Sequence, residues 1–284
     1  MQSSQLPVQS SPDSEARLRQ LEWLVREHSP HGEWTDWTLE LARLYAALAR
    51  SSDVAKLLGA CVALPVAEAF ALYGSALLET GDAARAAAAL EHAAQRFPED
   101  ASLKTVWGDA LFQGERFAEA LQCYRAACAL DERNPLPLRR LAQALFRLDR
   151  RDEAAKLLRD ACMRDPMHAE LWSSLGWVLL HRGQHSEAVP ALRRALDLKP
   201  GDVQCLKSLA LACFALGRRE ESLHCYESVL RLRPEDAECH FGTALLYLAG
   251  GHLKVAYQRV EVLQKLSPTL AEELRQKISE AQDR

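Results

Sequence analysis

Apolar residues recur along the chain with the spacing of paired amphipathic helices. Between residues 169 and 202, Trp172, Leu175 and Leu179 lie three or four residues apart, which places them on one face of a helix. A second apolar stripe follows at Ala188, Leu192 and Ala195. Because each stripe needs another apolar surface to cover it, the pattern predicts two helices packed against each other.

Small residues and helix-breaking residues support this interpretation. Gly176 and Ala188 lack bulk at the positions where two antiparallel helices would cross, so the backbones can approach closely. Gly183 is expected to form the turn between the helices. Pro200 is expected to end the second helix because proline has no N–H to donate.

The same arrangement returns every 34 residues, in six units from Ala67 to Leu270. The small residues of the first helix are Gly74, Gly108, Ala142, Gly176, Ala210 and Ala244. Those of the second helix are Ala86, Ala120, Ala154, Ala188, Ser222 and Ala256. The terminating prolines are Pro98, Pro166, Pro200, Pro234 and Pro268, with Glu132 in the one remaining place. A register kept over so many units predicts a repeat array rather than two globular domains.

This order of residues resembles the tetratricopeptide repeat, a 34-residue helix–turn–helix unit. The resemblance implies an all-α fold, a right-handed superhelical α-solenoid closed by N- and C-terminal capping helices. Alanine-rich helices make the chain similar to bacterial cytosolic members of the family. The expected segments are a disordered N-terminus (1–12), a capping helix and loop (13–34), a degenerate repeat (35–66), full repeats (67–100, 101–134, 135–168, 169–202, 203–236 and 237–270) and a capping helix (271–284).

The charge balance argues against two classes of partner. The chain has 35 basic and 39 acidic residues, a net charge of −4, so no overall positive field attracts nucleic acid or an anionic membrane surface. No run of about 18 apolar residues is present for membrane insertion. The first 20 residues lack the basic start and apolar core of a signal peptide, and the predicted location is the cytoplasm.

No pattern of catalytic or metal-binding residues stands out. Seven of the eight cysteines, all but Cys61, take places held by Leu or Ala in other repeats, so we interpret the cysteines as small hydrophobic residues. No C-x-x-C, phosphate loop, G-x-S-x-G or H-E-x-x-H occurs. His181 and His185 flank the turn at Gly183 and do not share a helical face. The sequence therefore predicts a protein that is not an enzyme and has no cofactor and no metal.

The resemblance also suggests where a partner would bind, since the first helices of this family line the concave wall of the superhelix. Residues at repeat positions 5, 9 and 13 vary, so the fold does not dictate them. The candidate groove residues are Arg139, Gln143, Arg147, Ser173, Trp177, His181, Lys207, Leu211, Phe241 and Leu245. Cationic groups beside an apolar floor suit a protein or peptide ligand that is apolar with acidic residues. The alternative is that Trp177, Leu211 and Leu245 only pack against neighbouring helices.

These expectations favour a non-catalytic scaffold or adaptor for protein–protein interaction, binding a peptide or helix in the groove. Asn134 is the only asparagine, so the asparagine-based carboxylate clamp of some relatives is not expected. Two other functions stay open at this point. One is a chaperone for a secreted or assembling protein, and the other is an architectural protein that associates with itself.

Overall fold

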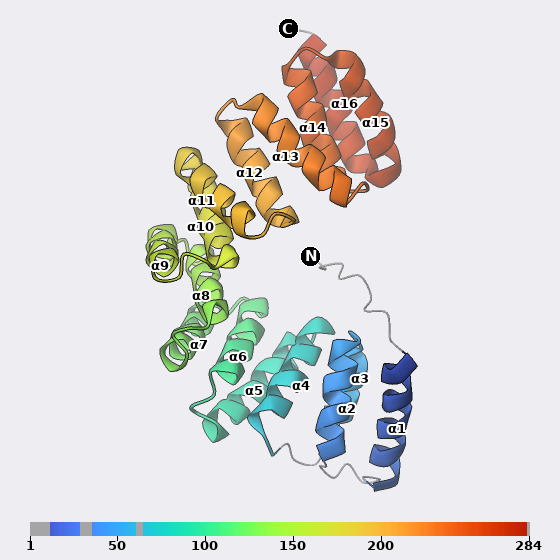
Figure 1. Ribbon diagram of the computed structural model, residues 1–284, viewed down its shortest axis with the longest axis vertical. Coiled ribbons are helices and arrows are strands. Elements are labelled where there is room, and N and C mark those ends of the chain that lie inside the picture. Colours follow the sequence, from blue (N-terminus) through green and yellow to red (C-terminus); the bar gives the residue numbers. More distant parts are fainter. Residues whose placement is uncertain (1–11, 29–35, 61–64, 283–284) are drawn as a thin grey trace. The chain divides into compact units, whose positions relative to one another are not determined.

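The computed structural model describes residues 12–28, 36–60 and 65–282, which form sixteen helices and no strand (Figure 1). The helices are α1 (Pro12–His28), α2 (Asp36–Ala47), α3 (Ser51–Gly59), α4 (Ala67–Glu79), α5 (Ala83–Arg96), α6 (Ala101–Gln113), α7 (Phe117–Leu130), α8 (Pro135–Arg147), α9 (Arg151–Arg164), α10 (Ala169–His181), α11 (His185–Leu198), α12 (Val203–Ala215), α13 (Arg219–Leu232), α14 (Ala237–Ala249), α15 (Leu253–Leu266) and α16 (Pro268–Gln282). The predicted all-α repeat fold is confirmed. Of the predicted disordered segment, residues 1–11 lie outside the described residues and Pro12 begins α1.

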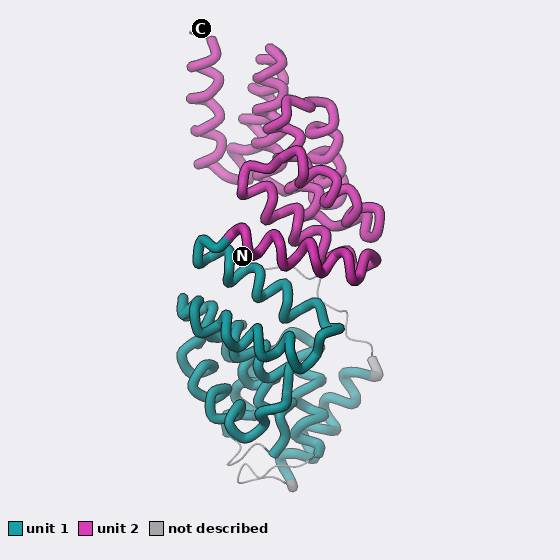
Figure 2. The backbone as a smooth tube through the Cα atoms, turned by 90° about the vertical axis from the view of Figure 1, so that its left-hand side faces the viewer, with its two compact units in different colours: residues 1–150 teal, residues 151–284 magenta. Residues whose placement is uncertain are grey.

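The chain divides into two compact units, Met1–Arg150 and Arg151–Arg284 (Figure 2). The sequence register runs through this boundary without interruption, and the boundary separates α8 from α9, the two helices of one 34-residue repeat. An array of this kind has no single central core because each repeat packs only against its neighbours. A continuous register can therefore hold two separate compact units.

Acidic residues at the end of one repeat fix the start of the next. Asp100, Asp202 and Asp236 each accept a hydrogen bond from a backbone N–H three residues later, at 2.7, 2.9 and 3.0 Å. Such N-caps satisfy a donor that has no partner within the helix. The first helices of the six full repeats begin at Ala67, Ala101, Pro135, Ala169, Val203 and Ala237, the residues expected from the register.

The turn between the two helices of a repeat needs one residue in the left-handed conformation. Gly183 and Gly217 fill this place as expected, with φ of 75° and 72°. In two repeats the expected glycine is one residue early, because Glu115 rather than Gly114 and Gly251 rather than Gly250 have positive φ. The left-handed residue therefore lies at the same position of each repeat, even where that residue is not glycine.

Glycine at the helix crossing allows the two helices of a repeat to touch. A β-carbon added to Gly74 would lie 2.6 Å from Leu90 Cδ1, and one added to Gly108 would lie 2.5 Å from Tyr124 Cε1. The corresponding residues Ala120 and Ala188 of the second helices are fully buried. The predicted helix crossing is confirmed.

A helix covers each end of the array. At one end, Arg17 of α1 pairs with Glu40 of α2 at 2.6 Å, and Leu21 is fully buried in the local core. At the other end, α16 buries Leu274 and Ile278 against α14 and α15. This helix begins at Pro268 rather than near residue 271. The proline that ends α15 also begins α16, since proline suits the first position of a helix.

Candidate functional site

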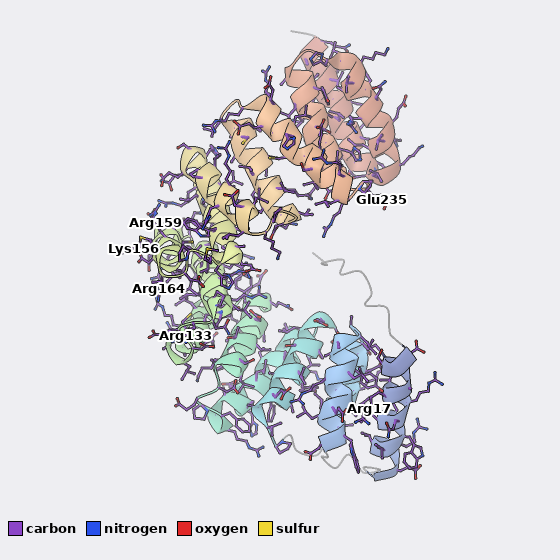
Figure 3. The ribbon with its side chains drawn as sticks, in the orientation of Figure 1. Arg17, Arg133, Lys156, Arg159, Arg164 and Glu235 are labelled. Carbon is purple, nitrogen blue, oxygen red and sulfur yellow. The ribbon has the colours of Figure 1, made fainter. Side chains whose placement is uncertain are left out.

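The first helices of successive repeats lie close together and form one surface in each unit. In Met1–Arg150, α2, α4, α6 and α8 approach one another in turn, and in Arg151–Arg284, α10 approaches α12 and α14 approaches α16. The second helices of neighbouring repeats have no comparable approach within the described parts of the chain. We call the surface of the first helices the inner face. Its counterpart is the outer face of the second helices, where Lys156, Arg159 and Arg164 of α9 are exposed (Figure 3).

One pair of first helices departs from this pattern. Within the described residues, α12 and α14 lack the close approach that the other consecutive first helices of each unit make. A cavity of about 400 Å³ lies at this place. Its wall consists of Lys207, Leu211, Phe214, Tyr226, Glu238, Cys239, Phe241, Gly242, Leu245 and Leu270. We call the space between α12 and α14 the α12–α14 seam.

The position of Tyr226 explains the shape of the seam. Tyr124, three repeats earlier, lies over Gly108 of its own repeat. Ala210 replaces that glycine in the repeat of Tyr226, and the ring of Tyr226 lies instead on Gly242 of the next repeat, with Cζ 2.6 Å from where a β-carbon would be. Because Gly242 has no side chain, this part of α14 adds nothing to fill the seam.

A second cavity continues the seam toward the C-terminal helix. It has a volume of about 470 Å³ and shares Phe214 and Leu245 with the first cavity. Lys277 and Glu280 of α16 lie at its far side. Phe214 is 43% exposed and Leu211 is 48% exposed. The seam therefore presents large apolar side chains to solvent.

Lys207 is held at one end of the seam by two carboxylates. Its Nζ lies 2.7 Å from Asp236 and 2.8 Å from Glu238. Burial alone would lower the pKa of Lys207, but the hydrogen bonds with these carboxylates outweigh burial and raise that pKa above its usual value. Lys207 thus stays charged and already has acidic partners, which weakens the expectation that it attracts acidic groups of a ligand.

The candidate residues of the other unit lie on α8. Arg147 is exposed, and its guanidinium lies 4.3 Å from the ring centroid of Phe117 and 5.7 Å from that of Phe112. Gln143 accepts a hydrogen bond from Arg140 at 3.3 Å, and Arg139 is half-buried. Arg147 is therefore a cation resting on aromatic rings, and cation–π contact of this kind holds a guanidinium in place.

Three further candidates lie on α10. The rings of Trp177 and His181 are 4.3 Å apart, and His181 Nδ1 lies 2.8 Å from the carbonyl oxygen of Trp177. Ser173 is half-buried. This group is separate from the seam residues, which come from α12, α13, α14 and α16.

The structure brings four of the predicted residues together, namely Lys207, Leu211, Phe241 and Leu245 in the seam. The sequence analysis missed Tyr226 and Gly242. A signal for them was present, because Gly242 is the one glycine at the sixth position of the six full repeats. That position holds Leu72, Val106, Arg140, Ser174 and Ser208 in the other repeats.

The described cysteines and acidic residues form no arrangement suited to a metal. Within the described residues, no group of three or more His, Cys, Asp or Glu side chains is placed to hold a metal ion. Cys205 and Cys239 are fully buried, and burial raises the pKa of each thiol to about 12. Cys61 lies outside the described residues. Among the described helices, none combines the length and apolar character needed to cross a membrane.

Family models identify the repeats. Three tetratricopeptide repeat models match residues 108–149, 139–203 and 179–240. Residues 108–240 of this chain are tetratricopeptide repeats. No curated protein sequence matches the chain. Repeats of this kind are typical of modules for protein–protein interaction, and they point to an interaction scaffold as the broad class.

Solved structures share the fold. Yeast Tom70 is similar with a TM-score of 0.69 and 16% identity, over 95% of this chain and 59% of Tom70. The Cut9–Hcn1 hetero-tetramer of the APC/C contains a chain with a TM-score of 0.67 and 17% identity, over 93% of this chain and 52% of that one. YrrB, described as a tetratricopeptide repeat protein with an unusual peptide-binding site, has a TM-score of 0.53 and 21% identity over 67% of this chain and 99% of YrrB. This chain thus spans just over half the length of the first two proteins.

Proposed function

We propose that this chain is a non-catalytic adaptor that holds a segment of a partner protein against its inner face. The observation that carries the proposal is the α12–α14 seam, where Leu211 and Phe214 are exposed in large part. Apolar side chains left exposed beside cavities are typical of binding surfaces. The peptide-binding site described for YrrB supports the same class of ligand.

The partner chemistry that we propose differs along the chain. On α8, the cationic side chains of Arg139 and Arg147 favour acidic residues in the partner. In the seam, the apolar wall favours large apolar side chains. A partner segment at the seam is therefore apolar and has no acidic residue beside Lys207, whose charge already has two carboxylate partners. Acidic residues suit a partner segment at α8, which belongs to the other compact unit.

Selection of peptides from a random-sequence display library with the full chain tests the proposal. Peptides that bind in a saturable way should lose affinity for Trp177→Ala and Leu211→Ala, which change the inner face. They should bind Met163→Ala and Leu232→Ala like the unchanged protein, since these residues are 67% and 55% exposed on the second helices. Circular dichroism and thermal unfolding confirm that each variant is folded. Equal affinity of all four variants would contradict the proposal.

A second function, a chaperone for a secreted or assembling protein, draws on the same apolar wall. A chaperone would keep an aggregation-prone partner soluble on co-expression, whereas an adaptor would bind a partner that is soluble by itself.

Self-association is tested by sedimentation velocity over a wide concentration range. A single monomeric species at all concentrations excludes an architectural role.

A further inference from the structure

The seam is a gap in an otherwise regular packing scheme. In the same unit, α10 approaches α12 and α14 approaches α16, whereas α12 and α14 are separated by the cavity of about 400 Å³. Every large side chain that lines this gap between the two first helices is apolar or aromatic, apart from the charged end at Lys207 and Glu238. A side chain of a partner protein that enters the cavity would therefore pack against both α12 and α14, as first helices pack against each other elsewhere in the unit.

The charges at the end of the seam indicate which kind of partner residue should lie next to the inserted side chain. Lys207 and Asp236 form a mostly buried ion pair, since their side chains are 15% and 10% exposed. Glu238 is 66% exposed. The three groups together carry one net negative charge, and its most accessible carrier is Glu238.

We propose that the α12–α14 seam is a specificity pocket for a partner segment in which a large apolar side chain is followed by a basic residue. The apolar side chain lies between Leu211, Phe241 and Leu245, and the basic residue lies beside Glu238. This proposal rests on the proposed function and adds a sequence rule to it. The rule is opposite in sign to the acidic preference at α8.

The walls of the pocket suit an aromatic side chain in particular. Phe214, Tyr226 and Phe241 contribute rings from three different helices. Ring pairs at the edge-to-face and offset distances add to the energy of simple burial. A cavity of this size falls within the range of about 300–1,000 Å³ that is usual for ligand pockets. We therefore use a phenylalanine side chain to test binding in the pocket.

Methyl NMR of the full chain with short peptides tests the proposal directly. The probe is acetyl-Gly-Ser-Phe-Lys-Ser-amide, and the controls replace its phenylalanine by alanine or its lysine by glutamate. We expect saturable shifts at Leu211, Leu245 and Leu270 with the Phe-Lys peptide. The Phe-Glu peptide should bind roughly three- to five-fold more weakly, the range expected for one exposed charge pair. The alanine peptide should give no shifts at these residues.

Two pairs of variants separate the apolar and the charged parts of the pocket. Leu211→Ala should abolish the shifts, whereas Leu232→Ala, an exposed leucine on α13 outside the cavity, should leave them unchanged. Glu238→Gln should remove the preference for lysine over glutamate, whereas Glu220→Gln, an exposed glutamate on α13, should keep it. The pocket assignment is overturned if the Phe-Lys peptide shifts none of the three leucines or if the Phe-Glu peptide binds equally well.

The outcome is distinguishable from failure of the proposed function. If library peptides bind and depend on Trp177 but not on Leu211 or Glu238, the adaptor function stands and the pocket is wrong. If neither a library peptide nor the Phe-Lys peptide binds the inner face, both the adaptor function and the pocket are wrong.

Discussion

Gly176 lies so close to Leu192 that a β-carbon at residue 176 would be 2.4 Å from Leu192 Cγ and 3.3 Å from the Leu192 backbone nitrogen. Leu192 is fully buried. The obstacle therefore includes backbone as well as a packed side chain, and little room exists for adjustment. The contact joins α10 to α11 within one repeat. Close contacts of this kind explain why small residues recur at a fixed interval in the sequence.

Substitution at this contact should loosen the repeat. We expect Gly176→Ala to lower the free energy of unfolding, since overpacking a core costs about 1–3 kcal/mol and the gain in helix propensity returns only about 1 kcal/mol. The matched control is Gly201→Ala, because a β-carbon at residue 201 would contact nothing within 4 Å. Denaturant unfolding of both variants measures the difference. Equal stability of the two would show that the crossing tolerates a methyl group.

Two tyrosines at equivalent places should respond differently to loss of their hydroxyl groups. Tyr124 Oη donates a hydrogen bond to Asp109 at 2.7 Å, and Arg140 lies 3.1 Å from the same carboxylate oxygen. Tyr124→Phe should cost about 1–2 kcal/mol of stability because it leaves a largely buried carboxylate with one partner fewer. Tyr226→Phe is the control, since the structure gives the Tyr226 hydroxyl no hydrogen bond among the described residues. A similar loss in both variants would contradict this account.

Buried thiols should make the fold sensitive to alkaline pH. Burial, and next the charge of Asp165, raise the pKa of Cys162 from 9.0 to about 12. Because the folded pKa is the higher one, this stabilisation is complete below about pH 9 and is lost as the pH rises from 9 to about 12. Over that interval one thiol contributes a slope of up to about 1.4 kcal/mol per pH unit. Unfolding free energies of the unchanged protein and of Cys162→Ala, measured over this range, should converge as the pH rises. Parallel curves would exclude the thiol as the cause.

Filling the seam from within should compete with a ligand. Leu245→Phe adds a ring to a residue that lines both cavities. We expect it to raise the free energy of unfolding, since cavity-filling substitutions commonly add about 0.5–2 kcal/mol of stability. We also expect it to weaken binding of the Phe-Lys peptide several-fold. Leu248→Phe is a useful comparison because Leu248 lines only the second cavity. Stronger peptide binding by Leu245→Phe would contradict insertion of a side chain at this place.

The repeat fold could be predicted because its determinants are local and periodic. Gly74, Gly108 and Gly176 mark helix crossings, and each recurs at a fixed interval. The turn was predicted less well where glycine and the left-handed residue do not coincide, as at Gly114 and Glu115. Glutamate carries no signal of positive φ, so the sequence alone favours the neighbouring glycine.

The candidate site could be predicted only in part, because it depends on differences between repeats. Leu211, Phe241 and Leu245 were recognised from their varying positions. The seam itself depends on a difference between repeats, since Ala210 stands where the repeat of Tyr124 has Gly108, and the ring of Tyr226 lies on Gly242 of the next repeat. The pairing of Lys207 with Asp236 and Glu238 joins neighbouring repeats through side-chain geometry, and a charge pattern along one helix does not reveal such a pair.

Hydrogen–deuterium exchange of the full chain, with and without a saturating library-selected peptide, tests the central claim most directly. The claim is that a partner segment binds the inner face and enters the α12–α14 seam. The predicted result is slower exchange in α10, α12 and α14 with no change in α11. Slower exchange confined to α11 and α13, or no change in α12 and α14, would contradict the claim.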